Sequence, residues 1–141
     1  MANCEESGMI SVQALDHIVL NVRDVEASAV WYQQVLGMRR EDYNAGSMRT
    51  SLRFGVQKIN LRPLSVSQDA WFTGHHPAAG SDDLCFLVEA APEDVVRHLA
   101  HSGVAVEIGP VIKSGALGPI TSVYCRDPDG NLIEIASYPV G

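Results

Sequence analysis

The stretch "LDHIVLNVRDVEASAVWYQQVLG", residues 15–37, decides the fold because it joins a strand to a helix. Every second residue of 18–22 is apolar and lies on one face, as in a strand that buries one side. Asp24 can cap a helix, and apolar residues then recur at spacings of four, three and four over residues 25–36. Gly37 is suited to end that helix, because glycine readily takes the left-handed conformation found after helix C-termini.

The same arrangement returns in the second half of the chain. The segment "DDLCFLVE", residues 82–89, alternates in the same way and precedes a second helical pattern. Asp83 follows His17 by the same number of residues as Gly103 follows Gly37, so the two passages are related by one constant offset in residue number. A constant offset indicates an internal repeat, although two ordinary strand–helix passages can also match by chance.

Three strand-like segments follow each helix, so the sequence predicts an α+β fold of two tandem βαβββ modules. We expect module one over residues 15–64, a connecting loop over 65–81 and module two over 82–138, in a single domain of residues 13–141 behind a loose tail of residues 1–12. The separation of Glu134 from Asn60 exceeds the constant offset, so the second module contains an insertion. We expect it in a glycine- and proline-rich loop over residues 109–120, of which 113–119 would form a lid or wall of the site. The predicted strands are residues 15–22, 38–45, 48–55, 57–64, 82–89, 104–111, 120–127 and 131–138.

Composition narrows the class of protein. The net charge is −7 and the 10 basic residues form no long run, which argues against a nucleic-acid-binding protein. No apolar run is long enough for a membrane span and the N-terminus has no signal-peptide pattern, so we expect a cytoplasmic protein. The cysteines are few and unpaired in spacing, and we expect Cys85 and Cys125 to be small buried hydrophobic residues.

Four polar residues occupy matching strand positions, on the face opposite the apolar one. These are His17 and Asp83 in the opening strands of the modules, and Asn60 and Glu134 in the closing strands. The pattern predicts curved sheets with helices on the convex side and a polar cavity on the concave side. One imidazole and two carboxylates in such a cavity suit a divalent cation such as Zn, Ni, Mn, Co or Fe.

Each of these residues also has a structural interpretation. His17 can be read as a hydrogen-bonded histidine, Glu134 as a residue at a solvated edge, and Asp83 as part of the "SDDL" turn. Asn60 is best explained as a hydrogen-bonding residue in the cavity wall. Arg53, Arg62 and Lys113 are candidates to bind an anionic substrate group, together with Asn60, because guanidinium and ammonium groups pair with carboxylates. Arg49 shares a strand face with Ser51 and Lys58 shares that of Asn60, so either can also meet such a group.

The opening "LDHIVLNV…WYQQVLGM", the central "DLCFLVE" and the ending "DPDGNLIEI" resemble the vicinal oxygen chelate superfamily. That family includes glyoxalase I, bleomycin resistance proteins, fosfomycin resistance proteins and extradiol dioxygenases. The segments "FGVQKINL" and "SGALGPITSVYCRDPDGNLIEI" resemble most the branch called glyoxalase domain-containing protein five. The resemblance covers residues 15–138.

The resemblance implies paired βαβββ modules in a homodimer, with a small-molecule site where modules meet. It implies metal ligands at the positions of His17, Asp83 and Glu134, with Asn60 at the fourth ligand position. It also implies lyase, isomerase or addition chemistry, in which Glu134 would move a proton. Aspartate and asparagine depart from the histidine, glutamine or glutamate usual at their two positions, and a single matched histidine disfavours iron dioxygenase chemistry. The alternative is a protein of the bleomycin-resistance type, which sequesters a ligand or drug with no metal.

Overall fold

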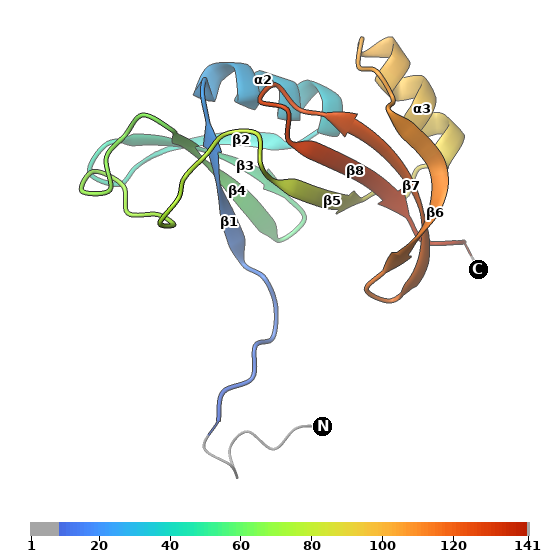
Figure 1. Ribbon diagram of the computed structural model, residues 1–141, viewed down its shortest axis with the longest axis horizontal. Helices are drawn as coiled ribbons and strands as arrows, with labels where there is room; N and C mark the ends of the chain where they lie inside the picture. The colour runs from blue at the N-terminus through green and yellow to red at the C-terminus, as the bar shows by residue number, and fades with distance from the viewer. Residues whose placement is uncertain (1–8, 141) are drawn as a thin grey trace.

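The computed structural model describes residues 9–140 and contains the two predicted βαβββ modules, which confirms the α+β fold (Figure 1). Module one comprises β1 (His17–Val22), α2 (Val25–Leu36), β2 (Arg39–Asn44), β3 (Met48–Phe54) and β4 (Gln57–Pro63). Module two comprises β5 (Asp83–Leu87), α3 (Pro92–His101), β6 (Ile108–Gly115), β7 (Gly118–Arg126) and β8 (Leu132–Ser137).

Each module folds into one mixed four-stranded sheet. Sheet A has the order β1-β4-β3-β2 and sheet B the order β5-β8-β7-β6, and in each the first pair of strands is parallel. Val19 lies opposite Asn60 in sheet A, and Cys85 lies opposite Glu134 in sheet B. The repeat in the sequence matches Val19 with Cys85 and Asn60 with Glu134, so it is preserved in the strand register.

The helix ends follow the local sequence. The side chain of Asp24 accepts a hydrogen bond of 3.0 Å from the amide of Ala27 and caps α2. Gly37 ends α2 with a φ of 66°, a conformation that costs a residue with a Cβ more than glycine. The buried side of α2 consists of Ser28, Ala29, Tyr32 and Val35, and Val25 and Leu36, the two ends of the predicted apolar stripe, are partly buried against the same core.

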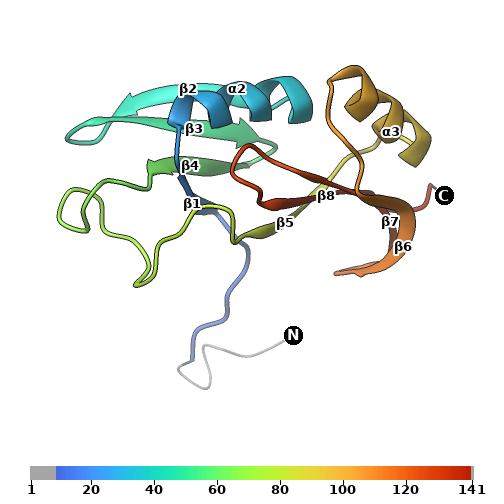
Figure 2. The same cartoon turned by 45° about the horizontal axis from the view of Figure 1, so that its top comes forward.

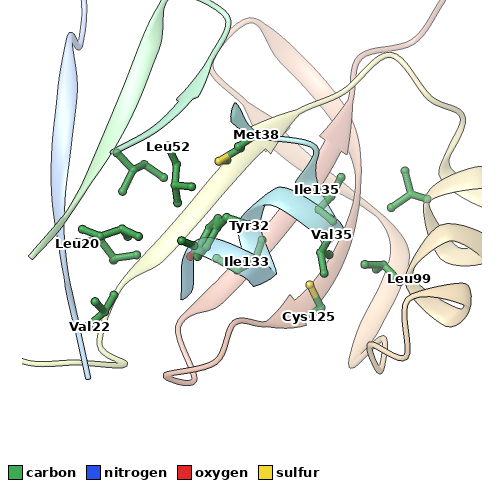
Figure 3. Packing of buried hydrophobic residues seen from close by; sticks show 14 of the residues in the cluster. Leu20, Val22, Tyr32, Val35, Met38, Leu52, Leu99, Cys125, Ile133 and Ile135 are labelled. Atoms are coloured by element: carbon green, nitrogen blue, oxygen red, sulfur yellow. The ribbon is translucent and has the colours of Figure 1, made fainter. Parts of the chain in front are cut away.

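Both helices lie on the same side of the two sheets (Figure 2). One apolar core lies between the helices and the sheets and draws residues from both modules, among them Leu20, Leu52, Leu99 and Ile133 (Figure 3). We call the opposite side of each sheet its open face, and neither sheet closes into a barrel.

The two predicted buried cysteines have different environments. Cys125 is fully buried in the core, as predicted. Cys85 is exposed, so that prediction was wrong. Its neighbours Leu84 and Phe86 pack against the core, and strand alternation therefore directs Cys85 to the open face.

The expected loop over residues 109–120 is mostly strand. β6 continues to Gly115 and β7 starts at Gly118, which leaves a short turn at Ala116 and Leu117. The insertion in module two therefore lengthens a hairpin, because cross-strand hydrogen bonds outweigh the glycine and proline content. Residues 104–107, which were predicted to be strand, precede β6 instead.

Two irregular segments complete the fold. The connection between the modules bends over part of the open face of sheet A, where the carbonyl oxygen of Trp71 accepts a hydrogen bond from Arg62. Residues 9–16 are exposed and extend away from the sheets (Figure 1), while the rest of the predicted tail lies outside the described residues. Neither α2, with 12 residues, nor α3, with 10 residues, is long enough to cross a bilayer, and they are the only helices in the described part of the chain.

Candidate functional site on the open faces

The open face of sheet A gathers positive charge. Register and alternation place on it three cross-strand rows, and the middle row contains Asn60, Ser51 and Glu41. Glu41 is the only carboxylate that the four strands contribute to this face. Five of the ten lysines and arginines of a chain with net charge −7 share it: Arg39, Arg49, Arg53, Lys58 and Arg62.

The middle row forms a short polar floor. Ser51 and Asn60 are both buried, and Ser51 Oγ donates a hydrogen bond of 2.6 Å to Asn60 Oδ1. No described residue accepts a hydrogen bond from the amide nitrogen of Asn60. The side chain is therefore a hydrogen-bonding wall residue with one donor group left for another molecule.

Arg62, expected to bind substrate, has a structural position. Only 1% of its surface is exposed. Its guanidinium donates to the carbonyl oxygens of Trp71 at 3.1 Å and Val66 at 2.8 Å, to Asn21 Oδ1 at 2.8 Å, and to the Ser67 carbonyl at 3.4 Å. The donors of Arg62 are therefore occupied by protein acceptors, and these hydrogen bonds hold the connecting segment against sheet A.

The other predicted substrate-binding cations are also separated from one another. Arg53 Nε donates to Glu41 Oε1 at 2.9 Å in an ion pair at the protein surface. Lys113 lies in sheet B, with its Nζ 5.8 Å from the centre of the Tyr124 ring. Asn60, Arg53 and Arg62 share the open face of sheet A, so a single chain does not bring all four predicted residues together.

Arg49 is held without a hydrogen-bonding partner. Its guanidinium carbon lies 3.8 Å from the centre of the Trp71 ring. Its Nε is buried, and no described residue accepts a hydrogen bond from it. A buried polar group in this state costs about 1–3 kcal/mol of stability, so the arginine is positioned but not satisfied.

His17 lies at the junction of the modules. It lines a cavity of about 130 Å³ together with Lys58, Phe54, Cys85 and Phe86. Its Nδ1 lies 2.7 Å from Oδ2 of Asp16, and this contact lowers the pKa of the Asp16 carboxyl.

The open face of sheet B carries a row of three reactive side chains. Cys85, Glu134 and Tyr124 lie opposite one another on β5, β8 and β7. Ser122 Oγ donates a hydrogen bond of 2.5 Å to Glu134 Oε2. Although Cys85 is exposed as a residue, its thiol is partly desolvated in the cavity wall. This partial burial and the nearby carboxylate of Glu134 raise the pKa of the thiol to about 11, and the same two causes raise the pKa of the Tyr124 hydroxyl to about 12.

Glu134 faces a second cavity, of about 300 Å³, whose wall includes the tip of the β6–β7 hairpin. Ser114, Gly115 and Tyr138 line it beside Glu134 and Cys85. The carboxylate is thus accessible within a pocket, rather than at a solvated edge. Cys85 borders both this cavity and the one that contains His17.

The three predicted metal ligands do not form a group within one chain. His17 and Glu134 line different cavities, and Asp83 is exposed at the start of β5. Within residues 9–140, no three histidine, cysteine, aspartate or glutamate side chains are placed to hold a metal ion together. The imidazole and carboxylate donors have suitable chemistry for a divalent cation, but the described residues of one chain do not bring them together.

Several residues at these faces were not predicted from the sequence. Ser122 and Tyr124 surround Glu134, and Cys85 lies opposite it, because all three occupy alternate strand positions facing the same way. The repeat could have identified Cys85, since it corresponds to Val19 at the constant offset. Alternation did place Arg49 on the correct face, but its stacking on Trp71 depends on how the connecting segment folds.

Comparison with known proteins identifies the family. The family model described as Glyoxalase/Bleomycin resistance protein/Dioxygenase superfamily matches residues 14–135. The chain is 41% identical over 129 residues to the glyoxalase domain-containing protein RDO1 of Mycosarcoma maydis, covering 92% of this chain and 70% of that protein. It is 39% identical over 133 residues to the virulence protein STM3117 of Salmonella typhimurium, covering 94% of this chain and 90% of that protein.

Solved structures agree with this assignment. The integron cassette protein VCH_CASS1 from the mobile metagenome of V. cholerae has a TM-score of 0.87 and 41% identity, covering 93% of this chain and 99% of that chain. More distant structures share the fold alone. They include lactoylglutathione lyase from Agrobacterium tumefaciens, at 22% identity and TM-score 0.69 over 90% of this chain and 95% of that one. Another is the antibiotic-binding protein TnmS3 from Streptomyces, at 19% identity and TM-score 0.70 over 92% of this chain and 99% of that one. By sequence and by structure, the chain belongs to the Glyoxalase/Bleomycin resistance protein/Dioxygenase superfamily.

Proposed function

We propose that two copies of this chain pair so that the open face of sheet A in one meets the open face of sheet B in the other, and that a small molecule binds between them. The observation that carries this proposal is the different character of the two faces. The open face of sheet A carries five cations and one carboxylate, and four of the cations remain at least partly exposed, since Arg62 is buried under the connecting segment. Sheet B balances Asp83 and Glu134 against Lys113 and an arginine, Arg126, that is already paired with Glu107. Exposed apolar side chains such as Leu87 and Ile108 lie beside them.

A symmetric pair would cover both faces at once. In a two-fold dimer the contact of A with B occurs twice, so each copy buries both of its open faces and the assembly closes. A contact of A with A would set cation against cation, so charge favours the pairing of A with B. Light scattering should give about twice the chain mass of 15.2 kDa at tens of micromolar. A single-chain mass would contradict the proposal.

Within each site, His17 of one copy would join Asp83 and Glu134 of the other around a divalent metal ion. When bound, such an ion would act as a Lewis acid that chelates two adjacent oxygens of the ligand. Glu134 is suited to move a proton, because it faces a cavity and is oriented by Ser122. The reaction would then be of the lyase, isomerase or addition type, as the name of the lactoylglutathione lyase with the same fold also suggests.

Subunit mixing tests the shared site sharply. Titration calorimetry with Mn(II), Ni(II) and Zn(II) should show at least about tenfold weaker binding in H17A and in E134Q. In a heterodimer of H17A and E134Q, one site has lost both ligands and the other has both intact. Random mixing should therefore restore about a quarter of the wild-type sites. A site within one chain would recover none.

A second candidate is a binding protein that sequesters its ligand without a metal. It is favoured by asparagine and aspartate at two of the four matched positions, where the resemblance leads one to expect stronger metal ligands. The fold shared with the antibiotic-binding protein TnmS3 is consistent with it. If wild type binds none of the three metals tighter than ~1 mM, this candidate replaces the enzyme.

A further inference from the structure

Most cations of the chain that lack a carboxylate partner lie together. Ion pairs satisfy five of the ten lysines and arginines, namely Arg23, Arg40, Arg53, Arg97 and Arg126. Within residues 9–140 the other five make no ion pair with a carboxylate, and four of these lie on the open face of sheet A: Arg39, Arg49, Lys58 and Arg62. The chain contains 17 acidic residues, so a shortage of carboxylates does not explain why these four cations make no ion pair.

Two of these four cations, Arg49 and Lys58, are held by aromatic rings and make no ion pair, although the charge of Lys58 also acts on the Asp16 carboxylate. Arg62 is satisfied by its buried acceptors and Arg39 is exposed. Arg49 stacks on Trp71 at 3.8 Å, and Lys58 Nζ lies 4.8 Å from the centre of the Tyr43 ring. An aromatic ring attracts a cation and holds its direction but supplies no net negative charge.

The polar floor lies between these two cations. Ser51 and Asn60 form the row between that of Lys58 and that of Arg49. Neighbouring rows on one face of a strand are about 7 Å apart, so the backbones of the Lys58 row and the Arg49 row are about 14 Å apart. A compact anion would therefore be held by the long side chains of both residues, which reach over the polar floor. The free amide of Asn60 points a donor into the same space, because its oxygen is taken by Ser51.

We propose that Arg49, Lys58 and Asn60 form a subsite for an anionic group of the ligand, a carboxylate or a phosphate. This inference rests on the proposed small-molecule site and specifies its ligand class. Guanidinium, ammonium and amide donors together match the several acceptor oxygens of such a group. The Nε of Arg49 is buried without a partner in the described chain, so the anion would be bound by the terminal amino groups of the guanidinium, and Nε–H would respond to the charge beside it.

The subsite also favours one class of ligand over another. A cationic compound would meet Arg49 and Lys58 as like charges, at a cost that grows as water is excluded from the site. The net charge of −7 is therefore a poor guide to the ligand, since the local charge of this face has the opposite sign.

The test uses the full-length protein after treatment with a chelator, so its outcome does not depend on metal binding. Inorganic phosphate and acetate are titrated at constant ionic strength, and the Nε–H resonance of Arg49 is followed by NMR, with acetamide as the uncharged counterpart of acetate. Both anions should shift this resonance in saturable fashion, and acetamide should not. The ratio of the two affinities tells whether a phosphate or a carboxylate fits better.

Variants assign the effect to the subsite. R49Q should weaken anion binding at least about tenfold and N60A about threefold, measured by calorimetry. R97Q removes an exposed arginine from α3 and should change the affinity less than about twofold. Equal affinities in R49Q and R97Q, or no saturable binding by wild type, would overturn the inference.

One further outcome would show that Arg49 contacts the second copy of the chain rather than a ligand. If R49Q dissociates the pair into single chains and leaves the affinity for phosphate unchanged, Arg49 is a counter-charge for the facing sheet, and the anion subsite is rejected. The proposed pairing would survive that result. Conversely, loss of anion binding in an R49Q protein that remains dimeric supports the subsite even if no metal binds.

Discussion

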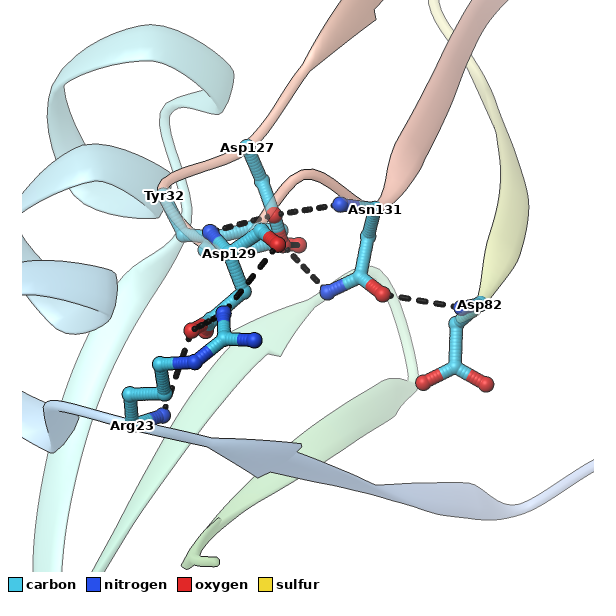
Figure 4. A network of polar contacts seen from close by, with 6 residues as sticks. All are labelled: Arg23, Tyr32, Asp82, Asp127, Asp129 and Asn131. Carbon is cyan, nitrogen blue, oxygen red and sulfur yellow. Dashed lines mark hydrogen bonds and ion pairs between the residues drawn. The ribbon is translucent and has the colours of Figure 1, made fainter. Parts of the chain in front are cut away.

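The hydroxyl of Tyr32 donates a hydrogen bond of 2.6 Å to Oδ2 of Asp127, which ties the helix of module one to the last turn of module two (Figure 4). Asp127 is buried and also accepts hydrogen bonds from the amides of Asp129 and Asn131 at 2.9 Å, and from Asn131 Nδ2 at 2.8 Å. Arg23 adds a contact of 3.2 Å to Asp129. These bonds and the shared core hold the modules in one orientation, and with them the relative position of the open faces.

Replacing Tyr32 by phenylalanine should lower the free energy of unfolding by about 1–2 kcal/mol. Burial and the neighbouring Asp127 raise the pKa of Tyr32, so its hydroxyl stays protonated and donates at all ordinary pH values. Denaturant titration measures the loss, and Y43F is the control because no hydrogen bond to the Tyr43 hydroxyl occurs among described residues. If the two variants are equally stable, the bond between the modules contributes nothing measurable.

Arg62 and Arg53 form a matched pair for a second prediction, since both were expected to bind substrate. R62M should cost about 2–4 kcal/mol, because it leaves buried carbonyls and Asn21 Oδ1 without donors. R53M breaks only an exposed ion pair and should cost less than about 1 kcal/mol. In a W31F background, which leaves Trp71 as the one tryptophan, the fluorescence should change in R62M and not in R53M, because only R62M releases the connecting segment. Equal losses would show that Arg62 is not a structural residue.

A third prediction concerns the thiol opposite Glu134. The pKa of Cys85 is raised to about 11 by burial first and by the Glu134 carboxylate second, with a smaller effect of Asp83. Only the thiolate is alkylated, so removing a negative neighbour favours the reactive form. E134Q should therefore shift the pH profile of alkylation to lower pH, and D83N should shift it less.

The measurement is the rate of reaction with iodoacetamide between about pH 8 and pH 11. A C4A background leaves Cys85 as the accessible thiol, because Cys125 is fully buried. At about pH 9 the order of rates should be E134Q, then D83N, then wild type. Identical profiles for all three proteins would mean that burial alone raises the pKa.

The repeat made the fold predictable from sequence. The constant offset shows which strand positions of module one correspond to which positions of module two. Asp24, Gly37 and Pro92 mark helix ends through local backbone and side-chain chemistry, which does not depend on the rest of the fold. The hairpin at Gly115 was misread because glycine and proline content reports local preference, whereas pairing with β7 decides the structure there.

The candidate site was predictable only in part. Alternation placed His17, Asn60 and Glu134 on the correct faces of their strands. It does not give the distance between residues of different sheets, because that distance depends on how the two sheets pack. The roles of Arg62 and Arg49 depend on where the connecting segment lies. The two arginines share a face, yet Trp71 supplies a carbonyl acceptor to one and an aromatic ring to the other.

A last prediction concerns the hairpin tip, residues 113–119, which the sequence suggested as a lid or wall. The tip is held by one side chain, since the amide of Leu117 donates a hydrogen bond of 2.9 Å to the hydroxyl of Tyr138. Gly115 permits this approach, because a Cβ there would lie 2.6 Å from that hydroxyl oxygen. The tip borders the cavity of Glu134, so its opening would control access to the carboxylate.

Y138F should therefore speed amide exchange at Leu117 by at least about fivefold while leaving β7 and β8 protected, because the bond restrains local opening and not global unfolding. Y43F again serves as the control. If the tip is a lid, saturation with the metal ion that binds best in calorimetry will slow exchange over residues 113–119 in wild type and less so in Y138F. Equal exchange with and without the ion would show that the tip is a fixed wall of the cavity and not a lid. Unchanged exchange in Y138F would show that strand pairing alone, without the Tyr138 hydrogen bond, holds the tip in place.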